Sequence, residues 1–348
     1  MKEIFVEPLL RWFEEHKREL PWREDRDPYR IWISEIMLQQ TRVEAVRGYY
    51  NRFLTALPTV QALAECPEDK LLKLWEGLGY YSRARNLKKG AMQVVESYGG
   101  RIPDTKKELM NLAGIGSYTA AAIASQAFEE PVAAVDGNVL RVYARYFADG
   151  RDISKGKTKT EVESELEPVM PNGRSGDFNQ AMMELGALVC VPNGAPKCME
   201  CPLAKTCKAY ANGSWDQYPK KAGKKERRVE EKTVLLIYHD KKVLIRKRKD
   251  SGLLAGLYEF PNMEGYCPKE AVLEYVHQLG LTPLRIKGSE NAKHIFSHVE
   301  WLMKSYEIKV DDTIEVPKDC LFIDMEQLRE EYSVPSAFGV YRELFLNK

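Results

Sequence analysis

Two glycines, Gly114 and Gly116, separate two stretches with strong helix signals, and this turn constrains the fold more than any other feature. Thr105, with a glutamate three residues later, predicts a capping box at the start of a helix over 105–112. The alanine-rich stretch 117–127 predicts a second helix. The unpaired backbone N–H groups at the start of that helix can bind an anion such as a phosphate. A tight connection between two packed helices, with no ligand, is the alternative interpretation.

The bulk composition is that of an ordinary globular protein. The 348 residues suffice for two or more domains, and 44% hydrophobic with 30% charged residues is a usual balance. No apolar run approaches the length of a membrane span, and the first residues lack the pattern of a secretion signal. We therefore expect no membrane association and a cytoplasmic location. The net charge of +1 excludes a uniformly basic nucleic-acid coat but not a local basic face.

The first part of the chain has helical patterns almost throughout. Asp27, followed by a proline, is a good N-cap for a first helix. Further helix-like stretches follow at 42–55, 59–64, 68–75, 82–98, 105–112, 117–127, 138–147, 158–169 and 177–188. We expect an all-helical domain over 1–212. The basic stretch 213–230 has no apolar periodicity, which indicates a linker.

After the linker the patterns change to strands. Expected strands lie at 233–238 and 243–248, joined by a hairpin turn, and near 284–289, 299–310 and 320–323. A helix is expected at about 268–279. Residues 231–348 therefore predict a smaller α+β domain, and the chain as a whole an all-helical domain followed by an α+β domain.

Four cysteines lie within eighteen residues, spaced C-x7-C-x2-C-x5-C: Cys190, Cys198, Cys201 and Cys207. No histidine lies among them, which favours zinc bound by four cysteines or an iron–sulfur cluster. The spacing alone does not choose between the two. A disulfide loop is the alternative, and the absence of a secretion signal disfavours it. The isolated Cys66, Cys267 and Cys320 are expected to be buried apolar fillers.

The helix–glycine turn–helix, an aspartate about twenty residues later (Asp136) and the four-cysteine loop together resemble the helix-hairpin-helix DNA glycosylase superfamily. Within it, the segments 32–41, 77–81 and 114–121 resemble the MutY adenine DNA glycosylases. The resemblance covers almost the whole chain. It implies a glycosylase that removes adenine mispaired with 8-oxoguanine, or with guanine, from duplex DNA.

The resemblance also implies one 4Fe–4S cluster on the four cysteines, a monomer, and an enzyme associated with the nucleoid. One departure concerns Cys190 and Cys198, which are separated by seven residues where the family commonly has six. Gly194 and Pro196 can absorb the extra residue in a looser loop.

Glu35 suits the role of a general acid. Its helix neighbours are almost all apolar, so its carboxyl should be desolvated, and desolvation raises the pKa of a carboxylic acid. By resemblance, Glu35 protonates adenine at N7 and later activates or orients water. A glutamate on a helix surface is the alternative.

Asp136 suits the stabilisation of a cationic sugar, although Asp-Gly-Asn before a helix is also a good N-cap, and both roles can hold. In related bifunctional enzymes of the endonuclease III type, a lysine stands at the position of Tyr118 and attacks the sugar. A tyrosine cannot form a Schiff base, so strand cleavage is not expected. An endonuclease III-like glycosylase with lyase activity remains the alternative function, and simple packing the alternative role of Tyr118.

By resemblance, further residues contact the DNA. The turn glycines Gly114 and Gly116 grip its backbone. The residues that contact the DNA strand opposite the adenine, or form a wedge at the lesion, are Gln40, Thr41, Leu78 and Tyr80. Residues of the adenine pocket are Trp22, Arg23 and Gln180, the last with an amide that can pair with adenine. Core packing is the alternative for Leu78 and Tyr80.

The second domain resembles a Nudix fold. The run 273–280 keeps only one of the acids with which a Nudix hydrolase holds magnesium, so pyrophosphate hydrolysis is not expected. Phe296, Ser297 and His298 match the family's sensor of 8-oxoguanine. Ser297 can accept a hydrogen bond from the N7–H that oxidation creates. A position in the core is the alternative for Phe296.

Overall fold

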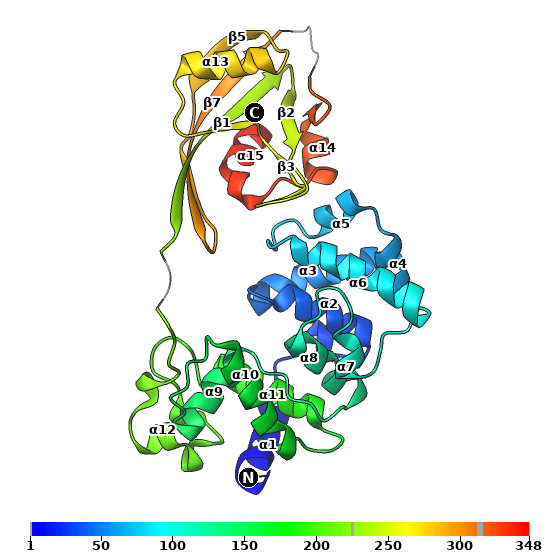
Figure 1. The fold of residues 1–348 in the computed structure, drawn as a ribbon, viewed down its shortest axis with the longest axis vertical. Helices are drawn as coiled ribbons and strands as arrows, with labels where there is room; N and C mark the ends of the chain where they lie inside the picture. The colour runs from blue at the N-terminus through cyan, green and yellow to red at the C-terminus, as the bar shows by residue number, and fades with distance from the viewer. Residues whose placement is uncertain (1, 224–225, 312–315, 348) are drawn as a thin grey trace. The chain divides into compact units, whose positions relative to one another are not determined.

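The computed structural model describes residues 2–223, 226–311 and 316–347 (Figure 1). By its internal contacts the chain divides into two compact units. The first contains Met1–Glu65 and Arg85–Gly223, and the second contains Cys66–Ala84 and Lys224–Lys348. The chain therefore crosses between the units three times.

The first unit is helical. Its α-helices are α1 (Glu7–His16), α2 (Pro28–Leu38), α3 (Val43–Ala56), α4 (Val60–Glu65), α6 (Ser82–Tyr98, beginning in the second unit), α7 (Lys106–Leu109), α8 (Ser117–Phe128), α9 (Gly137–Phe147), α10 (Gly156–Leu166), α11 (Ser175–Leu188) and α12 (Lys208–Ala211). Single turns are η1 (Lys2–Val6), η2 (Pro21–Arg23), η3 (Glu167–Val169), η4 (Cys198–Glu200), η5 (Ala204–Thr206) and η6 (Trp215–Gln217). Every helix expected in this unit is present. Among the described residues, no helix is long and apolar enough to span a bilayer.

The glycine turn between α7 and α8 has the expected form, with a shorter first helix. The Thr105 hydroxyl accepts a hydrogen bond from the Glu108 backbone N–H at 3.3 Å and so caps α7. After Leu109 the backbone forms i→i−3 bonds, so the helix tightens into turns before the glycines. Gly114 has φ +77°, and a Cβ there would lie 2.7 Å from the Cβ of Asn86. Only glycine satisfies both the positive φ and the close approach.

The second unit contains α5 (Glu68–Leu74) and a mixed sheet with its helices. The strands are β1 (Arg228–His239), β2 (Lys242–Lys247), β3 (Tyr258–Glu259), β4 (Asn262–Glu264), β5 (Pro283–Gly288), β6 (Ala292–Ile295), β7 (Val299–Val310) and β8 (Cys320–Ile323). The helices are α13 (Lys269–Gln278), α14 (Met325–Glu330), the turn η7 (Ser336–Phe338) and α15 (Gly339–Leu346). The path β3-β2-β1-β7-β5 is extended by β4 on β1, β6 on β7 and β8 on β2. The long strands β1 and β7 are parallel.

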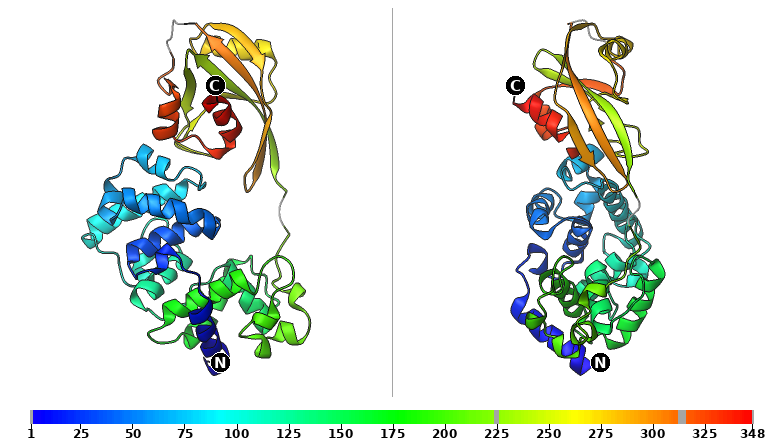
Figure 2. Two further views of the ribbon diagram at one scale, coloured as in Figure 1. Left: turned by 180° about the vertical axis from the view of Figure 1, so that it is seen from behind. Right: turned by 90° about the vertical axis from the view of Figure 1, so that its left-hand side faces the viewer.

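Side chains of β1 alternate between two cores, because successive residues of a strand point to opposite faces. Leu236 packs with Tyr341 and Phe345 of α15 on one face. Leu235 packs with Val272 of α13 on the other face. Figure 2 shows α13 and α15 on opposite sides of the sheet. The sheet is therefore covered on both faces, and the predicted α+β architecture is confirmed.

The expected linker over 213–230 is shorter in the structure. At its start, η6 and the backbone of Lys220, which bridges to Asp152, belong to the first unit. At its end, Arg228 already pairs with β7, because the parallel ladder begins there. Residues 224 and 225 lie outside the described part of the chain.

The segment Cys66–Ala84 also departs from the expected domains. The sequence pattern places it in the helical domain over 1–212, whereas its contacts place it in the second unit. The physical reason is a set of hydrogen bonds between residues 72–76 and residues 328–334. Lys73 donates to two backbone carbonyls of 328–334, whereas Ser333 and Val334 donate to residues of the segment 66–84.

Candidate active site

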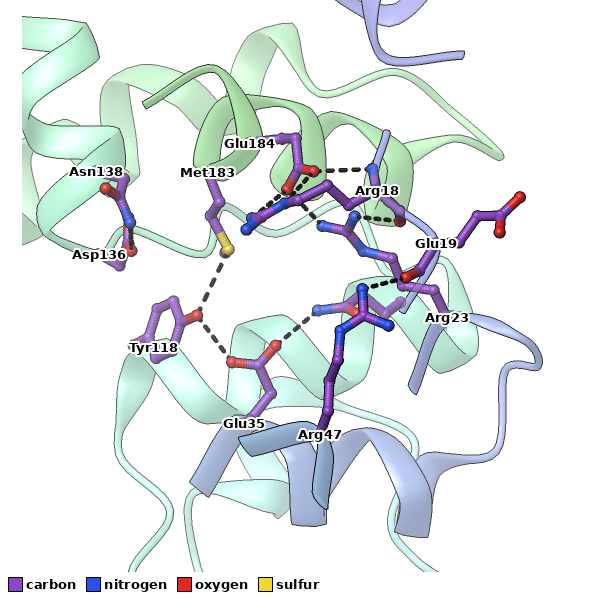
Figure 3. A network of polar contacts seen from close by, with 11 residues as sticks. Arg18, Glu19, Arg23, Glu35, Arg47, Tyr118, Asp136, Asn138, Met183 and Glu184 are labelled. Atoms are coloured by element: carbon purple, nitrogen blue, oxygen red, sulfur yellow. Dashed lines mark hydrogen bonds and ion pairs between the residues drawn. The ribbon is translucent and has the colours of Figure 1, made fainter. Parts of the chain in front are cut away.

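Glu35 lies in α2, whose first turn is capped by the side chain of Asp27. Glu35 is only 6% exposed to solvent. The carboxyl accepts hydrogen bonds from the Tyr118 hydroxyl at 2.8 Å and from Gln126 Nε2 at 3.1 Å, one on each oxygen (Figure 3). Burial raises the pKa of Glu35, and the two hydrogen bonds oppose that shift without cancelling it. The expected desolvated carboxyl is confirmed.

Both donors to Glu35 come from α8. Tyr118 and Gln126 are eight residues apart, about 12 Å along the helix, and each donates to a different oxygen of the Glu35 carboxyl. Met183 Sδ lies 3.5 Å from the Tyr118 hydroxyl. Burial beside Glu35 and Asp136 raises the pKa of Tyr118 well above its usual value. The hydroxyl therefore stays protonated and donates to Glu35.

Asp136 is the N-cap of α9, as one interpretation of the sequence predicted. Its carboxyl accepts hydrogen bonds from Val139 N at 2.8 Å and from Asn138 Nδ2 at 2.7 Å. Burial raises the pKa of Asp136, and these hydrogen bonds oppose the rise. The charge of Asp136 also contributes to the raised pKa of Glu35. The structure thus couples the buried carboxyl of Glu35 with that of the half-buried Asp136, each fixed by its own donors.

A second layer holds Asn138. Arg141 Nη2 donates to Asn138 Oδ1 at 2.8 Å and to the Gly186 carbonyl at 2.7 Å. Arg141 Nε donates to the Cys190 carbonyl at 2.8 Å. A Cβ on Gly186 would lie 2.7 Å from the Cβ of Asn138, so α11 approaches this point closely. Hydrogen bonds therefore run without a break from Asp136 to the start of the cysteine loop.

A cavity of about 830 Å³ opens beside this network. Its lining includes the three residues expected in the adenine pocket: Trp22, Arg23 and Gln180. Gln126 lines the same cavity and also donates to Glu35. Glu35, Tyr118 and Asp136 are not among the lining residues. Gln126 therefore connects the cavity to the buried carboxyl.

Two arginines at the cavity wall share one buried carboxylate, that of Glu184 on α11 (Figure 3). Arg18 donates to it from its backbone N, Nε and Nη2 at 2.8–2.9 Å. Arg23 Nη2 adds a fourth hydrogen bond at 3.0 Å. Burial alone would raise the pKa of Glu184, but the arginines outweigh it and lower that pKa to about 2. The carboxylate is ionised and fully bonded.

The turn glycines lie at the surface of the first unit. Gly114 and Gly116 are both exposed, and Gly116 is the N-cap of α8. A glycine has no side chain with which to cap the first N–H groups of the helix. Those groups are thus available to a phosphate oxygen.

Gln40 and Thr41 follow the end of α2. Gln40 is exposed, with φ +58°. The Thr41 backbone N–H bonds to the Leu38 carbonyl at 3.3 Å, and its hydroxyl donates to the Gln39 carbonyl at 3.4 Å. The side chain of Gln40 is thus presented to solvent on a fixed turn.

In the second unit, a loop over 77–80 carries the two expected wedge residues. Leu78 is buried at 6% exposure, whereas Tyr80 is exposed at 47%. Tyr80 has φ +46°, and the glycine on each side of Leu78 also has a positive φ. The Tyr80 hydroxyl lies 2.5 Å from Ser297 Oγ, so the structure brings together a predicted wedge residue and a predicted sensor residue.

The sensor loop over 296–298 is anchored by its phenylalanine. The Phe296 ring lies 4.8 Å from the ring of Trp301, which is buried in the core. It also contacts the ring of His294 at 4.5 Å. Ser297 and His298 are exposed. Packing fixes the base of the loop and leaves its tip accessible.

The four expected metal ligands line one small cavity of about 30 Å³ with Arg145: Cys190, Cys198, Cys201 and Cys207. All four are free thiols, so no disulfide closes the loop. Arg145 Nη1 lies 3.4 Å from Cys190 Sγ. Burial and the neighbouring cysteines raise the pKa of Cys201 to about 12, so four thiolates together would need a compensating cation. Four sulfur donors are the ligand chemistry of an iron–sulfur cluster.

No group of three or more side chains poised to hold a single metal ion occurs among the residues that the structure describes. Of the isolated cysteines, Cys66 and Cys320 are buried as expected. Cys267 is only half-buried, which corrects the expectation for that residue. It follows a turn at the edge of the sheet, where its Sγ lies 3.4 Å from the Glu264 carbonyl.

Two family models match the chain. The HhH-GPD superfamily of base excision DNA repair proteins matches residues 33–171, and the NUDIX domain matches residues 233–342. The fold and the site therefore define a DNA glycosylase of base excision repair with a Nudix-like second domain.

Similar proteins of known name identify the kind of DNA glycosylase more closely. An adenine DNA glycosylase from Mus musculus is 36% identical over 365 aligned positions, which cover 88% of this chain and 71% of the mouse protein. One from Buchnera aphidicola subsp. Baizongia pistaciae is 36% identical over 301 positions, which cover 85% of this chain and 83% of that protein. The chain belongs to the adenine DNA glycosylase family, which confirms the predicted family and the prediction of an adenine DNA glycosylase of base excision repair.

Solved structures agree with the helical fold. A thermostable thymine-DNA glycosylase superposes with a TM-score of 0.56 at 33% identity, covering 61% of this chain and 97% of that chain. An endonuclease III trapped as a covalent intermediate with DNA gives a TM-score of 0.52 at 25% identity, covering 61% of this chain and 98% of that chain.

Sequence reasoning missed several residues of the site: Arg18, Gln126, Asn138, Arg141 and Glu184. Two of them carried a signal. Gln126 lies eight residues after Tyr118 on one helix, and Glu184 lies four residues after Gln180 on another, spacings that place side chains on one face. The partners of Glu184 lie more than 160 residues away in sequence, so no local pattern could reveal them.

Proposed function

We propose that the enzyme hydrolyses the N-glycosidic bond of adenine paired with 8-oxoguanine, or with guanine, in duplex DNA and leaves an abasic site. One observation carries the proposal: a buried carboxyl, Glu35, is held by Tyr118 and by Gln126, which itself lines a cavity. At about 830 Å³, the cavity is of the size usual for ligand pockets, and we infer that it receives the flipped base, with Gln126 between the cavity and Glu35.

Glu35 is the general acid of the proposed reaction. Its raised pKa keeps a proton on the carboxyl at higher pH than an exposed glutamate would. The proton passes to N7 of the adenine as the glycosidic bond breaks, so the base leaves as a neutral molecule. The Glu35 carboxylate then accepts a proton from the water that attacks the sugar, which restores the acid.

Asp136 is the proposed stabiliser of the cationic sugar. Its carboxyl is held by a backbone N–H and by Asn138, so it does not need to reorganise as positive charge develops. That positive charge also favours the ionised form of Asp136. A pair of carboxyls in which one is an acid and the other an anion follows the logic of glycoside hydrolysis.

Tyr118 supports a reaction that ends at the abasic site. Its hydroxyl donates to Glu35 and has a raised pKa, so it is neither an amine nor an activated nucleophile. Water therefore completes the reaction, without a Schiff base and without strand cleavage.

Several residues are proposed to contact the DNA. Those for the flipped adenine are Trp22, Arg23 and Gln180. Those for the opposite strand and the lesion are Gln40, Thr41, Leu78, Tyr80, Phe296, Ser297 and His298. Ser297 would distinguish 8-oxoguanine from guanine by accepting its N7–H. The turn at Gly114 and Gly116 would bind a backbone phosphate.

The proposed cofactor is one 4Fe–4S cluster, held by Cys190, Cys198, Cys201 and Cys207. Such a cluster would bind the four sulfurs as thiolates, offset part of their negative charge and tie the loop together. Arg145 supports this assignment, because its guanidinium lies beside Cys190 and adds positive charge.

The test is an excision assay on duplexes with adenine opposite 8-oxoguanine, opposite guanine and opposite thymine, each analysed with and without alkali. We expect strand breaks only after alkali, and only with the first two duplexes. Asp136→Asn should bind the abasic product duplex but lose excision. Breaks without alkali, no excision from the 8-oxoguanine duplex, or full turnover by Asp136→Asn would each contradict the proposal.

A further inference from the structure

The second unit contains a polar pair, Lys73 and Glu76, that no role described so far uses. The two residues lie at the end of α5 and just after it, immediately before the loop over 77–80. Lys73 Nζ lies 2.8 Å from Glu76 Oε2. Their side chains are only 15% and 14% exposed. A charged pair with so little solvent needs further partners.

Lys73 finds those partners on the C-terminal part of the unit. Its ammonium donates to the Leu328 carbonyl at 3.0 Å and to the Tyr332 carbonyl at 3.1 Å. With the bond to Glu76, all three N–H groups of the lysine are used. The lysine therefore fastens α5 to the backbone at the end of α14.

Glu76 completes the same attachment. Its Oε1 accepts a hydrogen bond from Val334 N at 3.0 Å and lies 3.4 Å from Arg342 Nη1 on α15. The neighbouring Ser333 hydroxyl donates to the Leu72 carbonyl at 3.3 Å. Side chains and backbone thus join the two parts of the second unit at several points within a short span.

The attachment continues directly into the loop over 77–80. Trp75 Nε1 donates to the Gly79 carbonyl at 3.1 Å. Arg83 Nη2 donates to the carbonyls of Leu78 and Gly79 at 2.9 and 3.0 Å. At the tip of the loop, the Tyr80 hydroxyl lies 2.5 Å from Ser297 Oγ. A displacement of α5 would therefore move Tyr80 away from Ser297.

We propose that Lys73 and Glu76 are positioning residues for lesion discrimination. They hold the loop over 77–80 on the C-terminal part of the second unit, so that Tyr80 and Ser297 meet the base opposite adenine as one preformed surface. This inference rests on the proposed function, because it concerns the choice between 8-oxoguanine and guanine.

An exposed ion pair joins the same two parts and provides a matched control. Lys247 Nζ lies 3.1 Å from Asp69 Oδ1, with side chains 41% and 54% exposed. Exposed pairs of this kind contribute little, because solvent screens them. Asp69→Asn should therefore leave the position of the loop unchanged.

The test compares single-turnover excision of adenine opposite 8-oxoguanine and opposite guanine. For Glu76→Gln and for Lys73→Met, the preference for 8-oxoguanine should fall by about tenfold, the equivalent of one hydrogen bond at about 1.4 kcal/mol. The rate opposite guanine should stay near that of the unchanged enzyme, which also shows that the catalytic unit is folded. Asp69→Asn should keep the full preference.

A double-mutant cycle with Ser297→Ala separates positioning from a general structural role. If Glu76 acts through Ser297, adding Glu76→Gln to Ser297→Ala should change the preference by less than about twofold. Additive effects, an unchanged preference, or equal losses on both duplexes would overturn the inference. If circular dichroism shows that Lys73→Met or Glu76→Gln is unfolded, Lys73→Gln, which keeps one donor group, replaces it in the assay. An unchanged preference for 8-oxoguanine in Lys73→Gln would also overturn the inference.

The two proposals fail in different ways. If the unchanged enzyme does not excise adenine opposite 8-oxoguanine, the proposed function is wrong. If the unchanged enzyme prefers 8-oxoguanine and Glu76→Gln keeps that preference, only the positioning role is wrong.

Discussion

Replacing Glu184 with glutamine should destabilise the first unit by an amount that can be derived from its pKa. Four hydrogen bonds from Arg18 and Arg23 hold that pKa at about 2, against an ordinary value of 4.5. A difference of about 2.5 pKa units corresponds to about 3 kcal/mol of stability at neutral pH. The side chain is 1% exposed, so solvent screening does not reduce this figure.

The pH dependence gives the prediction its sign. Because the pKa is lowered on folding, the contribution is present above the unfolded value of about 4.5 and is lost as the pH falls towards 2. Urea unfolding followed by circular dichroism at 222 nm reports mainly on the helical first unit. The difference between the unchanged protein and Glu184→Gln should be about 3 kcal/mol at pH 7 and should shrink steadily below pH 4.5.

A surface pair provides the control. Asp25 lies 2.7 Å from Arg30, and both side chains are nearly half exposed, so Asp25→Asn should change stability by less than about 0.5 kcal/mol. A loss below about 1 kcal/mol for Glu184→Gln, or a loss that does not vary between pH 7 and pH 3, would refute the assigned role of the carboxylate.

Three further predictions concern the catalytic network and the cysteine loop. Tyr118→Phe removes a hydrogen bond that lowers the pKa of Glu35, so the fall of the excision rate with rising pH should shift to higher pH, as measured in a single-turnover pH profile. Gly186→Ala places a Cβ 2.7 Å from that of Asn138 and should slow excision by about tenfold, with product-DNA affinity retained in a binding titration. Cys201→Ala should lower both the iron content by metal analysis and the melting temperature, and an unchanged iron content would exclude this cysteine as a ligand.

Much of the helical unit was predictable because its helices carry local signals. The strand β7 was also expected with its observed bounds, since alternating apolar residues mark it clearly. The strands β3 and β4 have only two and three residues, too few to show a periodicity, and were not expected. Helix α1 was overlooked although Pro8 and a buried apolar stripe mark it.

In the active site, the burial of Glu35 was predictable from the sequence, whereas its hydrogen-bond donor Gln126 was not. The apolar neighbours of Glu35 gave its burial correctly. Its second donor, Gln126, depends on how α8 crosses α2, and a crossing cannot be read from either helix alone. The same limit applies to the segment 66–84, whose helical pattern carries no information about the part of the chain that it contacts.

The insertion of residues 66–84 into the second unit affects how the enzyme can be divided. A cut after residue 223 would look like a clean removal of the C-terminal domain, yet it would take away the carbonyl partners of Lys73 and the backbone partner of Glu76. In the remaining fragment, Lys73 and Glu76 would keep only each other as partners and would become exposed to solvent. Activities of such a truncated enzyme would then report the loss of the partners of segment 66–84 as well as the loss of residues 224–348. Recombination at the linker would exchange the backbone partners at 328–334 without exchanging Lys73 and Glu76, so the two halves of this contact are best inherited together.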